Sequence, residues 1–197
     1  GVGQLDLIDS DTISISNINR QILATHSTVG RLKVDVAKER VLDINPDCVV
    51  RTYPCFYLPD TADQFDFTQY DYIVDAIDTL SPKAALIKGA LDRSLPIVSA
   101  MGAGAKTDPT RVEIADIGRT HHCPLAHMLR KRLHKMGIRT GFYAVFSAEP
   151  VREGAMILSE ETNKKSNTGT ISYMPAVFGC ACASVVVRDL LGEMKNE

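Results

Sequence analysis

Residues 5–9, Leu-Asp-Leu-Ile-Asp, have the pattern of a short buried strand that ends in an acid. Residues 71–76 (DYIVDA) repeat this pattern and lead into acids at Asp75 and Asp78. Three further runs also predict strands: 49–53, 95–100 and 112–115. The chain is therefore expected to contain a sheet built from short apolar strands.

Helical segments separate these strands. Apolar residues at helical spacing predict a helix over residues 34–45, which Pro46 ends, and another is expected over 82–94. Alternating strands and helices predict an α/β fold with a doubly wound, mostly parallel, Rossmann-like sheet. Sites in such sheets lie at the carboxyl ends of the strands. Three acids fall at such ends: Asp9, Asp75 and Asp78.

Composition narrows the class of protein. The 197 residues suit one domain with a full core, or one domain with a long insertion, and 45% hydrophobic with 23% charged residues is typical of a globular chain. The net charge of −2 gives no global attraction to nucleic acid or membrane. Five cysteines form no CxxC pair, so a zinc ribbon has no support, and their odd number without a signal sequence predicts a cytoplasmic location.

Side chains suited to ATP follow the first strand. Asp9 can accept hydrogen bonds from ribose hydroxyls, as an acid after the second strand of a mononucleotide unit does. Arg20 and Lys33 can neutralise triphosphate oxygens, and Asp78 can hold Mg²⁺ together with phosphates. Each residue alone also has an ordinary explanation as a cap, a turn or a solvated side chain. The nucleotide interpretation is favoured because several short strings occur in a fixed order.

The strings LIDSD (7–11), SNINRQ (16–21), VGRLK (29–33) and DAID (75–78) resemble the MoeB/ThiF/HesA family, whose adenylating architecture is shared with ubiquitin-activating enzymes. This resemblance implies ATP-dependent activation of a carboxylate as an acyl-adenylate, with ATP and Mg²⁺ bound. It implies these contacts: ribose at Asp9; magnesium at Asp11 and Asp78; phosphates at Asn17, Arg20 and Lys33; and Gln21 close to the site. Among them, Arg20, Lys33 and Asp78 would be the catalytic residues.

The chain departs from the family at its start. The family has a glycine-rich loop before the strand that carries Asp9, and that loop offers backbone N–H groups to phosphates. Gly1-Val2-Gly3 is not this loop, because it lies directly before the second strand of the unit. We therefore expect the N-terminal phosphate-loop unit to be missing from this chain.

Four longer strings point to a subgroup. DTLSPKAALI (78–87), GAGAKTDPTRVEIADIGRT (102–120), PLAHMLRKRL (124–133) and AVFSAEP (144–150) resemble the tRNA threonylcarbamoyladenosine dehydratases. This resemblance implies that ATP activates the carboxylate of the threonylcarbamoyl group and that a ring closes with loss of AMP. Other functions stay open: an activator of a ubiquitin-like or sulfur-carrier protein, with a carrier or cysteine desulfurase as partner, and a non-catalytic scaffold. A nicotinamide dehydrogenase is disfavoured, since no GxGxxG precedes an acid at the right distance.

The cysteines bear on this choice. A carrier activator would use Cys123, whose thiol pKa two neighbouring histidines would lower, whereas the dehydratase chemistry needs no thiol. Cys180 and Cys182 lie in an apolar run and are predicted to be buried packing residues.

Residues 119–139 carry six Lys or Arg and four His residues but no Asp or Glu. Such a patch would bind RNA phosphates in a salt-sensitive way, and Arg130, Lys131 and Arg132 are the expected tRNA contacts. A solvated amphipathic helix over 124–136 explains the composition equally well.

Residues 142–149 contain aromatic side chains and a polar pair, and for each of these groups a functional role and a structural role are open. The aromatic residues Phe142, Tyr143 and Phe146 could stack on a base, although the core suits Phe146 better. Ser147 and Glu149 could face the acyl group or a cation, or merely end a strand.

The expected organisation has three parts: an ATP-binding part over 1–115, an insertion or crossover region with the basic patch over 116–168, and a C-terminal strand and helix over 169–197 that return to the same domain.

The apolar residues 174–191 are marginal in length for a bilayer, so a buried or dimer-interface helix is predicted and no membrane insertion is expected. The family resemblance suggests a homodimer.

Overall fold

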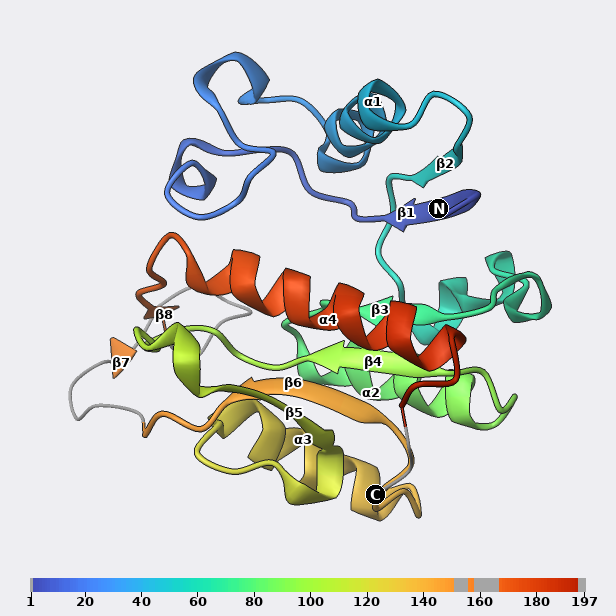
Figure 1. The fold of residues 1–197 in the computed structure, drawn as a ribbon, viewed down its shortest axis with the longest axis vertical. Helices are drawn as coiled ribbons and strands as arrows, with labels where there is room; N and C mark the ends of the chain where they lie inside the picture. Colours follow the sequence, from blue (N-terminus) through green and yellow to red (C-terminus); the bar gives the residue numbers. More distant parts are fainter. Residues whose placement is uncertain (1, 151–155, 158–166, 195–197) are drawn as a thin grey trace. The chain divides into compact units, whose positions relative to one another are not determined.

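The computed structural model describes residues 2–150, 156–157 and 167–194. It divides the chain into two compact units, Gly1–Phe65 and Asp66–Glu197. Parallel strands joined by helices form the first unit and most of the main sheet of the second, as Figure 1 shows. The predicted α/β class is thus confirmed.

The first unit is a strand–helix–strand arrangement. Strand β1 (Gln4–Ile8) pairs in parallel with β2 (Val49–Tyr53), and helix α1 (Lys33–Ile44) joins them. The helix ends two residues before Pro46, because the residue that precedes a proline disfavours helical backbone. The elements predicted at 5–9, 34–45 and 49–53 are confirmed to within one residue at each end.

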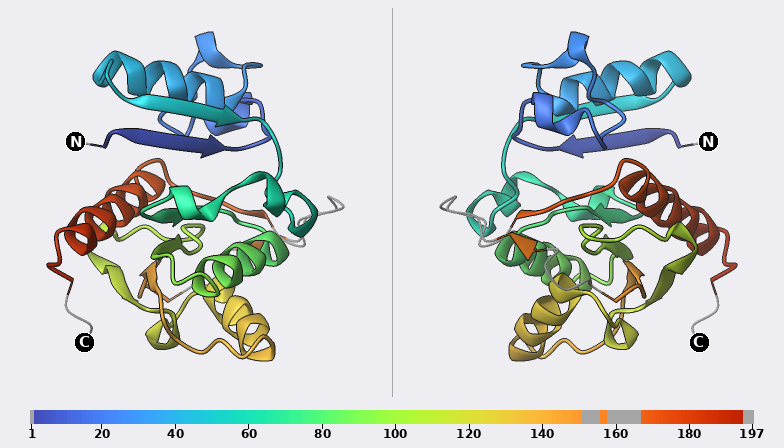
Figure 2. Two further views of the ribbon diagram at one scale, coloured as in Figure 1. Left: turned by 90° about the vertical axis from the view of Figure 1, so that its right-hand side faces the viewer. Right: turned by 90° about the vertical axis from the view of Figure 1, so that its left-hand side faces the viewer.

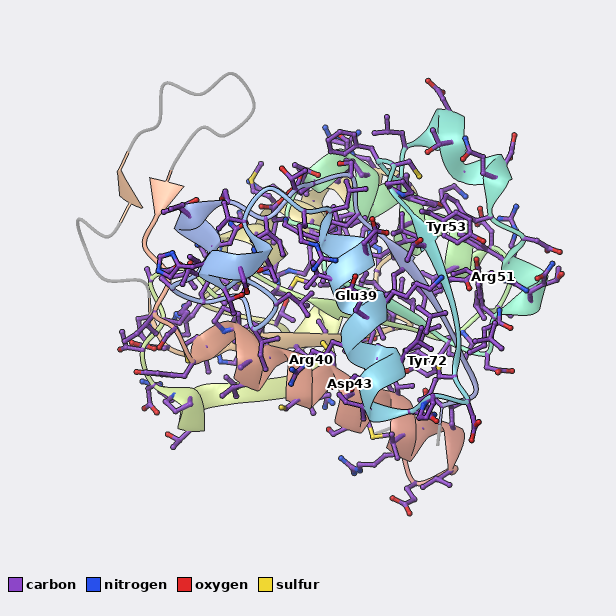
Figure 3. All side chains as sticks on the ribbon, turned by 90° about the horizontal axis from the view of Figure 1, so that it is seen from above. Glu39, Arg40, Asp43, Arg51, Tyr53 and Tyr72 are labelled. Atoms are coloured by element: carbon purple, nitrogen blue, oxygen red, sulfur yellow. The ribbon has the colours of Figure 1, made fainter. Side chains whose placement is uncertain are left out.

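Charged side chains cover the solvent side of α1. Three of them are labelled in Figure 3: Glu39, Arg40 and Asp43. On β2, the hydroxyl of Tyr53 donates to Oδ2 of Asp6 at 3.4 Å, and Nη1 of Arg51 lies 3.9 Å from the same oxygen. These contacts tie the two strands across their shared register, in which Asp6 faces Arg51.

The second unit contains a four-stranded sheet in the order β3-β4-β6-β5. Strands β3 (Ile73–Asp75), β4 (Ile97–Ala100) and β6 (Tyr143–Ser147) run parallel, and β5 (Val112–Asp116) runs antiparallel to β6. Helix α2 (Leu80–Leu91) connects β3 to β4. The sheet is therefore mostly parallel, with one antiparallel edge.

Helices cover both faces of this sheet, as the two views in Figure 2 show. Helix α4 (Met174–Leu190) lies on one face, and α2 and α3 (Pro124–Lys135) lie on the other. The core between α4 and the sheet is formed by Val98, Val145, Met174, Phe178, Cys182 and Val185. No helix of the described residues is long and apolar enough to span a bilayer.

Shorter elements complete the described chain. Strands β7 (Met156–Ile157) and β8 (Asn167–Thr168) form a small antiparallel pair. Short 3-10 helices cover Ile15–Asn17, His26–Thr28, Pro59–Gln64, Phe67–Gln69, Pro109–Arg111 and Ile117–Arg119.

The structure corrects several expectations. Residues 169–173 form no strand, and β8 ends at Thr168, directly before them. The expected C-terminal part, 169–197, therefore contributes only helix α4 in the residues that the structure describes. Phe142 and Phe146 are buried beside and within β6, where their rings cannot stack on an RNA base. Cys180 is exposed on α4, whereas Cys182 is buried as expected, since neighbours two positions apart on a helix face different sides.

Candidate functional site

Three charged side chains meet where β1 ends and α1 begins. The amino nitrogen of Lys33 lies 2.7 Å from Oδ2 of Asp11 and 3.6 Å from Oδ2 of Asp9. The side chain of Lys33 is 16% exposed, whereas those of Asp9 and Asp11 are 40% and 57% exposed. A largely packed lysine therefore holds its charge beside two solvent-accessible carboxylates.

Backbone contacts fix this cluster. The backbone nitrogen of Lys33 donates to the carbonyl oxygen of Asp11 at 3.0 Å, and that of Asp11 donates to Oδ1 of Asp9 at 2.8 Å. The nitrogen of Gly30 donates to the carbonyl of Ile13 at 2.8 Å, with Gly30 at a φ of 86°, which glycine adopts without strain. The loop from β1 is thus tied directly to the start of α1.

The loop between β1 and α1 contains the other predicted phosphate residues. Asn17 is buried, and its Oδ1 accepts the backbone nitrogen of Ser14 at 3.0 Å. Nη1 of Arg20 donates to the carbonyl of Ser16 at 2.8 Å and to Oδ1 of Asn19 at 2.9 Å. The side chain of Asn17 therefore shapes the turn, and the guanidinium of Arg20 folds back onto it.

The turn is anchored to the rest of the first unit. Ile18 and Leu23 pack against a buried cluster of Ile13, Ala24 and Val36, the last of which belongs to α1. Gln21 is half-buried, and its backbone nitrogen donates to the carbonyl of Asn17 at 2.9 Å. Five of the seven residues assigned to nucleotide binding thus lie on the loop or strand end that precede α1, and Lys33 starts the helix.

Asp78, the seventh, belongs to the second unit and lies exposed in the turn between β3 and α2. Under this turn, Oδ2 of Asp75 lies 2.7 Å from Nζ of Lys83 and accepts the hydroxyl of Ser99 at 2.6 Å. The sequence predicts Asp75 as one of the strand-end acids of the site, but in the structure its side chain is buried. Lys83 and Ser99 were missed, although a lysine inside the apolar run PKAALI was a usable signal.

The donor set can be tested against magnesium. Among the described residues, no three His, Cys, Asp or Glu side chains gather closely enough to hold a metal ion by themselves. Mg²⁺ binds through one or two carboxylates together with phosphate oxygens and water. The Asp11 carboxylate in the first unit and the Asp78 carboxylate in the second unit are both exposed, and either one alone has the character of a ligand for an ion that arrives with a nucleotide.

Helix α3 is amphipathic and also carries exposed basic residues, as the sequence predicts. Ala126, Leu129 and Leu133 are buried, and Lys131 and Arg132 are exposed. Arg130 differs from its neighbours because its Nη1 donates to the carbonyl of Thr120 at 2.7 Å and also to the Thr120 hydroxyl. Of the three expected RNA contacts, Arg130 is thus held by its own chain.

Ser147 ends β6, and Glu149 follows two residues later; both side chains are buried. The Glu149 carboxylate accepts the backbone nitrogens of Thr107 at 2.7 Å and Asp108 at 3.0 Å, together with the Thr107 hydroxyl at 3.0 Å. Ser147 is fully buried. The structure therefore favours a structural role over contact with an acyl group or a cation. Ser147 ends the strand, and Glu149 stabilises the turn at 107–108.

Cys123 lies at the start of α3 with only 4% of its surface exposed. The neighbouring Lys106 is also buried, and its amino group donates to the carbonyls of His122 (2.9 Å) and Glu149. Burial lowers the pKa of Lys106. A thiol in this position is shielded from a large protein substrate, which weakens the carrier-activator alternative.

Comparisons with known proteins agree with this geometry. The ThiF family model matches residues 1–197. The tRNA threonylcarbamoyladenosine dehydratase of Bacillus subtilis is 40% identical over 207 residues, covering 99% of this chain and 80% of that protein. The Escherichia coli dehydratase is 35% identical, over 100% of this chain and 80% of its own length.

Solved structures give the same result. The E. coli tRNA N6-threonylcarbamoyladenosine dehydratase in complex with ATP has a TM-score of 0.87 and 33% identity, over 97% of this chain and 76% of that one. HcgE from Methanothermobacter marburgensis, bound to guanylylpyridinol and ATP, has a TM-score of 0.68 at 17% identity, and so shows likeness of fold alone.

Proposed function

The chain belongs to the ThiF family, and from this premise we propose that it is an enzyme that uses ATP to cyclise threonylcarbamoyladenosine in tRNA. The dehydratases of B. subtilis and E. coli, similar over nearly the whole chain, support this choice within the family. The structural observation that carries it is the amino group of Lys33 between the carboxylates of Asp9 and Asp11. A cation beside exposed acids at a strand end suits a nucleotide with its metal.

The reaction has two steps. A carboxylate oxygen of the threonylcarbamoyl group attacks the α-phosphorus of ATP, and pyrophosphate leaves. A nucleophilic atom of the same modified nucleoside then attacks the acyl carbon, its proton is released to solvent, and AMP leaves as the ring closes. The net change to the tRNA is the loss of one water. Because the attacking groups belong to the substrate, the enzyme needs positioning and charge compensation more than a nucleophile of its own.

The residues take the following roles in this proposal. Asp9 accepts the ribose hydroxyls. Lys33 and Arg20 compensate charge on the phosphates, and Lys33 exchanges its contact with Asp11 for phosphate oxygens. Asn17 shapes the loop that carries Arg20 and lies with Gln21 near the phosphates. Mg²⁺, when bound, would supply charge neutralisation at the phosphates, and the family resemblance implies Asp11 and Asp78 as its carboxylates.

The exposed basic side of α3 is the proposed contact for tRNA. Lys131 and Arg132 provide charge there that would neutralise backbone phosphates. We extend the proposal to a cytoplasmic homodimer, as the family resemblance suggests.

The direct test is mass analysis of tRNA that carries threonylcarbamoyladenosine, after incubation with ATP and the full-length protein. A loss of one water per modified base, with release of AMP and pyrophosphate, is expected. Unchanged tRNA mass with wild-type protein that binds ATP would reject the reaction. A Cys123→Ser variant should retain cyclisation, since no step uses a thiol; loss of cyclisation by a folded variant would show that the thiol takes part in the reaction. The carrier-activator alternative instead predicts no cyclisation by the wild-type protein and a carrier thioester that Cys123→Ser abolishes.

A further inference from the structure

A buried ionic cluster lies beneath the turn that carries Asp78. Nζ of Lys83 donates to Oδ2 of Asp75 at 2.7 Å, to the carbonyl of Ile77 at 2.9 Å and to that of Ala100 at 2.8 Å. All three ammonium protons therefore have partners. The Ser99 hydroxyl donates to the same Asp75 oxygen at 2.6 Å.

A buried ion pair of this kind contributes little net free energy to folding. Lys83, Asp75 and Ser99 are each at most 1% exposed. Removing two charges from water costs several kcal/mol per ion, and well-packed apolar residues often stabilise such positions equally well. A role beyond packing is therefore indicated.

The contacts converge on the residue that precedes Asp78. The backbone nitrogen of Ile77 donates to Oδ1 of Asp75 at 3.0 Å, and the carbonyl of Ile77 accepts from Lys83. Both polar backbone groups of Ile77 are thus held by the two halves of one ion pair. The bond from Lys83 to Ala100 fixes the same turn to the end of β4.

We propose that Lys83, with Asp75 and Ser99, is a positioning residue that fixes the backbone at Ile77, so that the Asp78 carboxylate is held ready for the metal–nucleotide complex. This inference rests on the proposed metal role of Asp78. Partners that orient a metal ligand typically change metal affinity about 10- to 100-fold when removed. Lys83 itself touches neither nucleotide nor metal in this account.

The test measures ATP binding to the full-length protein over a series of Mg²⁺ concentrations. Lys83→Met is expected to raise the Mg²⁺ midpoint about 10- to 100-fold, with ATP affinity in EDTA changed less than about threefold. Exchange of the Ile77 amide hydrogen in nucleotide-free protein should accelerate about tenfold or more. Lys88→Met, on the same helix, is the matched control: it removes only the surface pair with Asp92 and should alter neither quantity.

Two further variants keep the outcome decisive. Ser99→Ala leaves the ion pair intact and removes one hydrogen bond to Asp75. It therefore tests the positioning role even if Lys83→Met does not fold, and its Mg²⁺ midpoint for ATP binding is expected to rise about fivefold. If Asp78→Asn abolishes the Mg²⁺ dependence while Ser99→Ala and any folded Lys83→Met protein match wild type, the positioning role is wrong and the proposed function stands. If Asp78→Asn leaves the Mg²⁺ dependence intact, the metal role of Asp78 fails, and the positioning role fails with it.

Discussion

Lys33 is joined to Asp11 twice, through its backbone nitrogen at 3.0 Å from the Asp11 carbonyl oxygen and through its amino group at 2.7 Å from Oδ2 of Asp11. The backbone bond places the start of α1 beside the loop after β1. The side-chain contact can be exchanged for a phosphate without moving that backbone. Binding of ATP should therefore depend on the side chains of this cluster.

Replacing Lys33 should weaken binding of ATP more than binding of AMP, because the lysine compensates charge along the triphosphate. A charge-assisted contact contributes about 1.5–3 kcal/mol, so Lys33→Met should lower ATP affinity about 10- to 100-fold. Calorimetric titration with both nucleotides checks this. Lys38→Met, on the same helix, is the control and should bind ATP like wild type. An equal loss for ATP and AMP would place Lys33 away from the outer phosphates.

Asp9 should recognise the ribose. The wild-type protein is expected to bind ATP about tenfold or more tightly than 2′,3′-dideoxy-ATP, since the carboxylate loses its hydroxyl partners in the analogue. Asp9→Asn should narrow this ratio, mainly through weaker binding of ATP. Competition binding with the two nucleotides measures the ratio. The same preference in wild type and variant would remove Asp9 from the ribose.

Reversing the charge of Lys131 and Arg132 together should weaken tRNA binding and flatten its salt dependence. Each lost phosphate contact removes about one unit from the slope of log affinity against log salt. Filter binding over a salt series compares the K131E/R132E protein with a K38E/R40E control on α1. Equal slopes for the K131E/R132E protein and wild type would show that α3 is only a solvated amphipathic helix.

Glu149 should matter for stability. Its buried carboxylate accepts two backbone nitrogens and one hydroxyl, so Glu149→Ala removes the shared acceptor of three half-buried donors. The free energy of unfolding should fall by about 2 kcal/mol or more. Urea denaturation measures this, with the exposed Glu113→Ala on β5 as a control expected to change it by less than about 0.5 kcal/mol. A similar small change for both would contradict the bracing role.

The Cys182 thiol should make stability depend on alkaline pH. Burial raises its pKa from 9.0 to about 11, an effect that Lys83 opposes and Asp75 reinforces. Between these values the unfolded chain loses the proton before the folded one does, so stability falls as pH rises from about 9 to about 11. The loss attributable to this thiol is about 2–3 kcal/mol.

Denaturation at several pH values, with wild type compared to two cysteine variants, measures the contribution of the Cys182 thiol. Cys182→Ala should reduce the fall in unfolding free energy across that pH range. The exposed Cys180→Ala should leave the fall unchanged. Identical pH profiles for wild type and Cys182→Ala would show that the thiol does not titrate in this way.

The sequence by itself determined the local elements and the charged cluster of the first unit. Strand and helix periodicity, with Pro46 as a stop, located β1, α1 and β2, because these patterns depend on neighbours a few residues apart. Asp9 and Asp11 were readable as strand-end acids, and Lys33 was readable as the start of a helix.

Only the tertiary structure decided which charged side chains are buried and what they hold. Lys83 looked like a helix lysine and Glu149 like a strand-end acid, yet their partners lie up to 17 and 42 residues away in the sequence. Arg130 likewise turned inward to Thr120, ten residues away. Burial depends on which helices and strands pack together, and that pairing is set by long-range contacts that no local pattern contains.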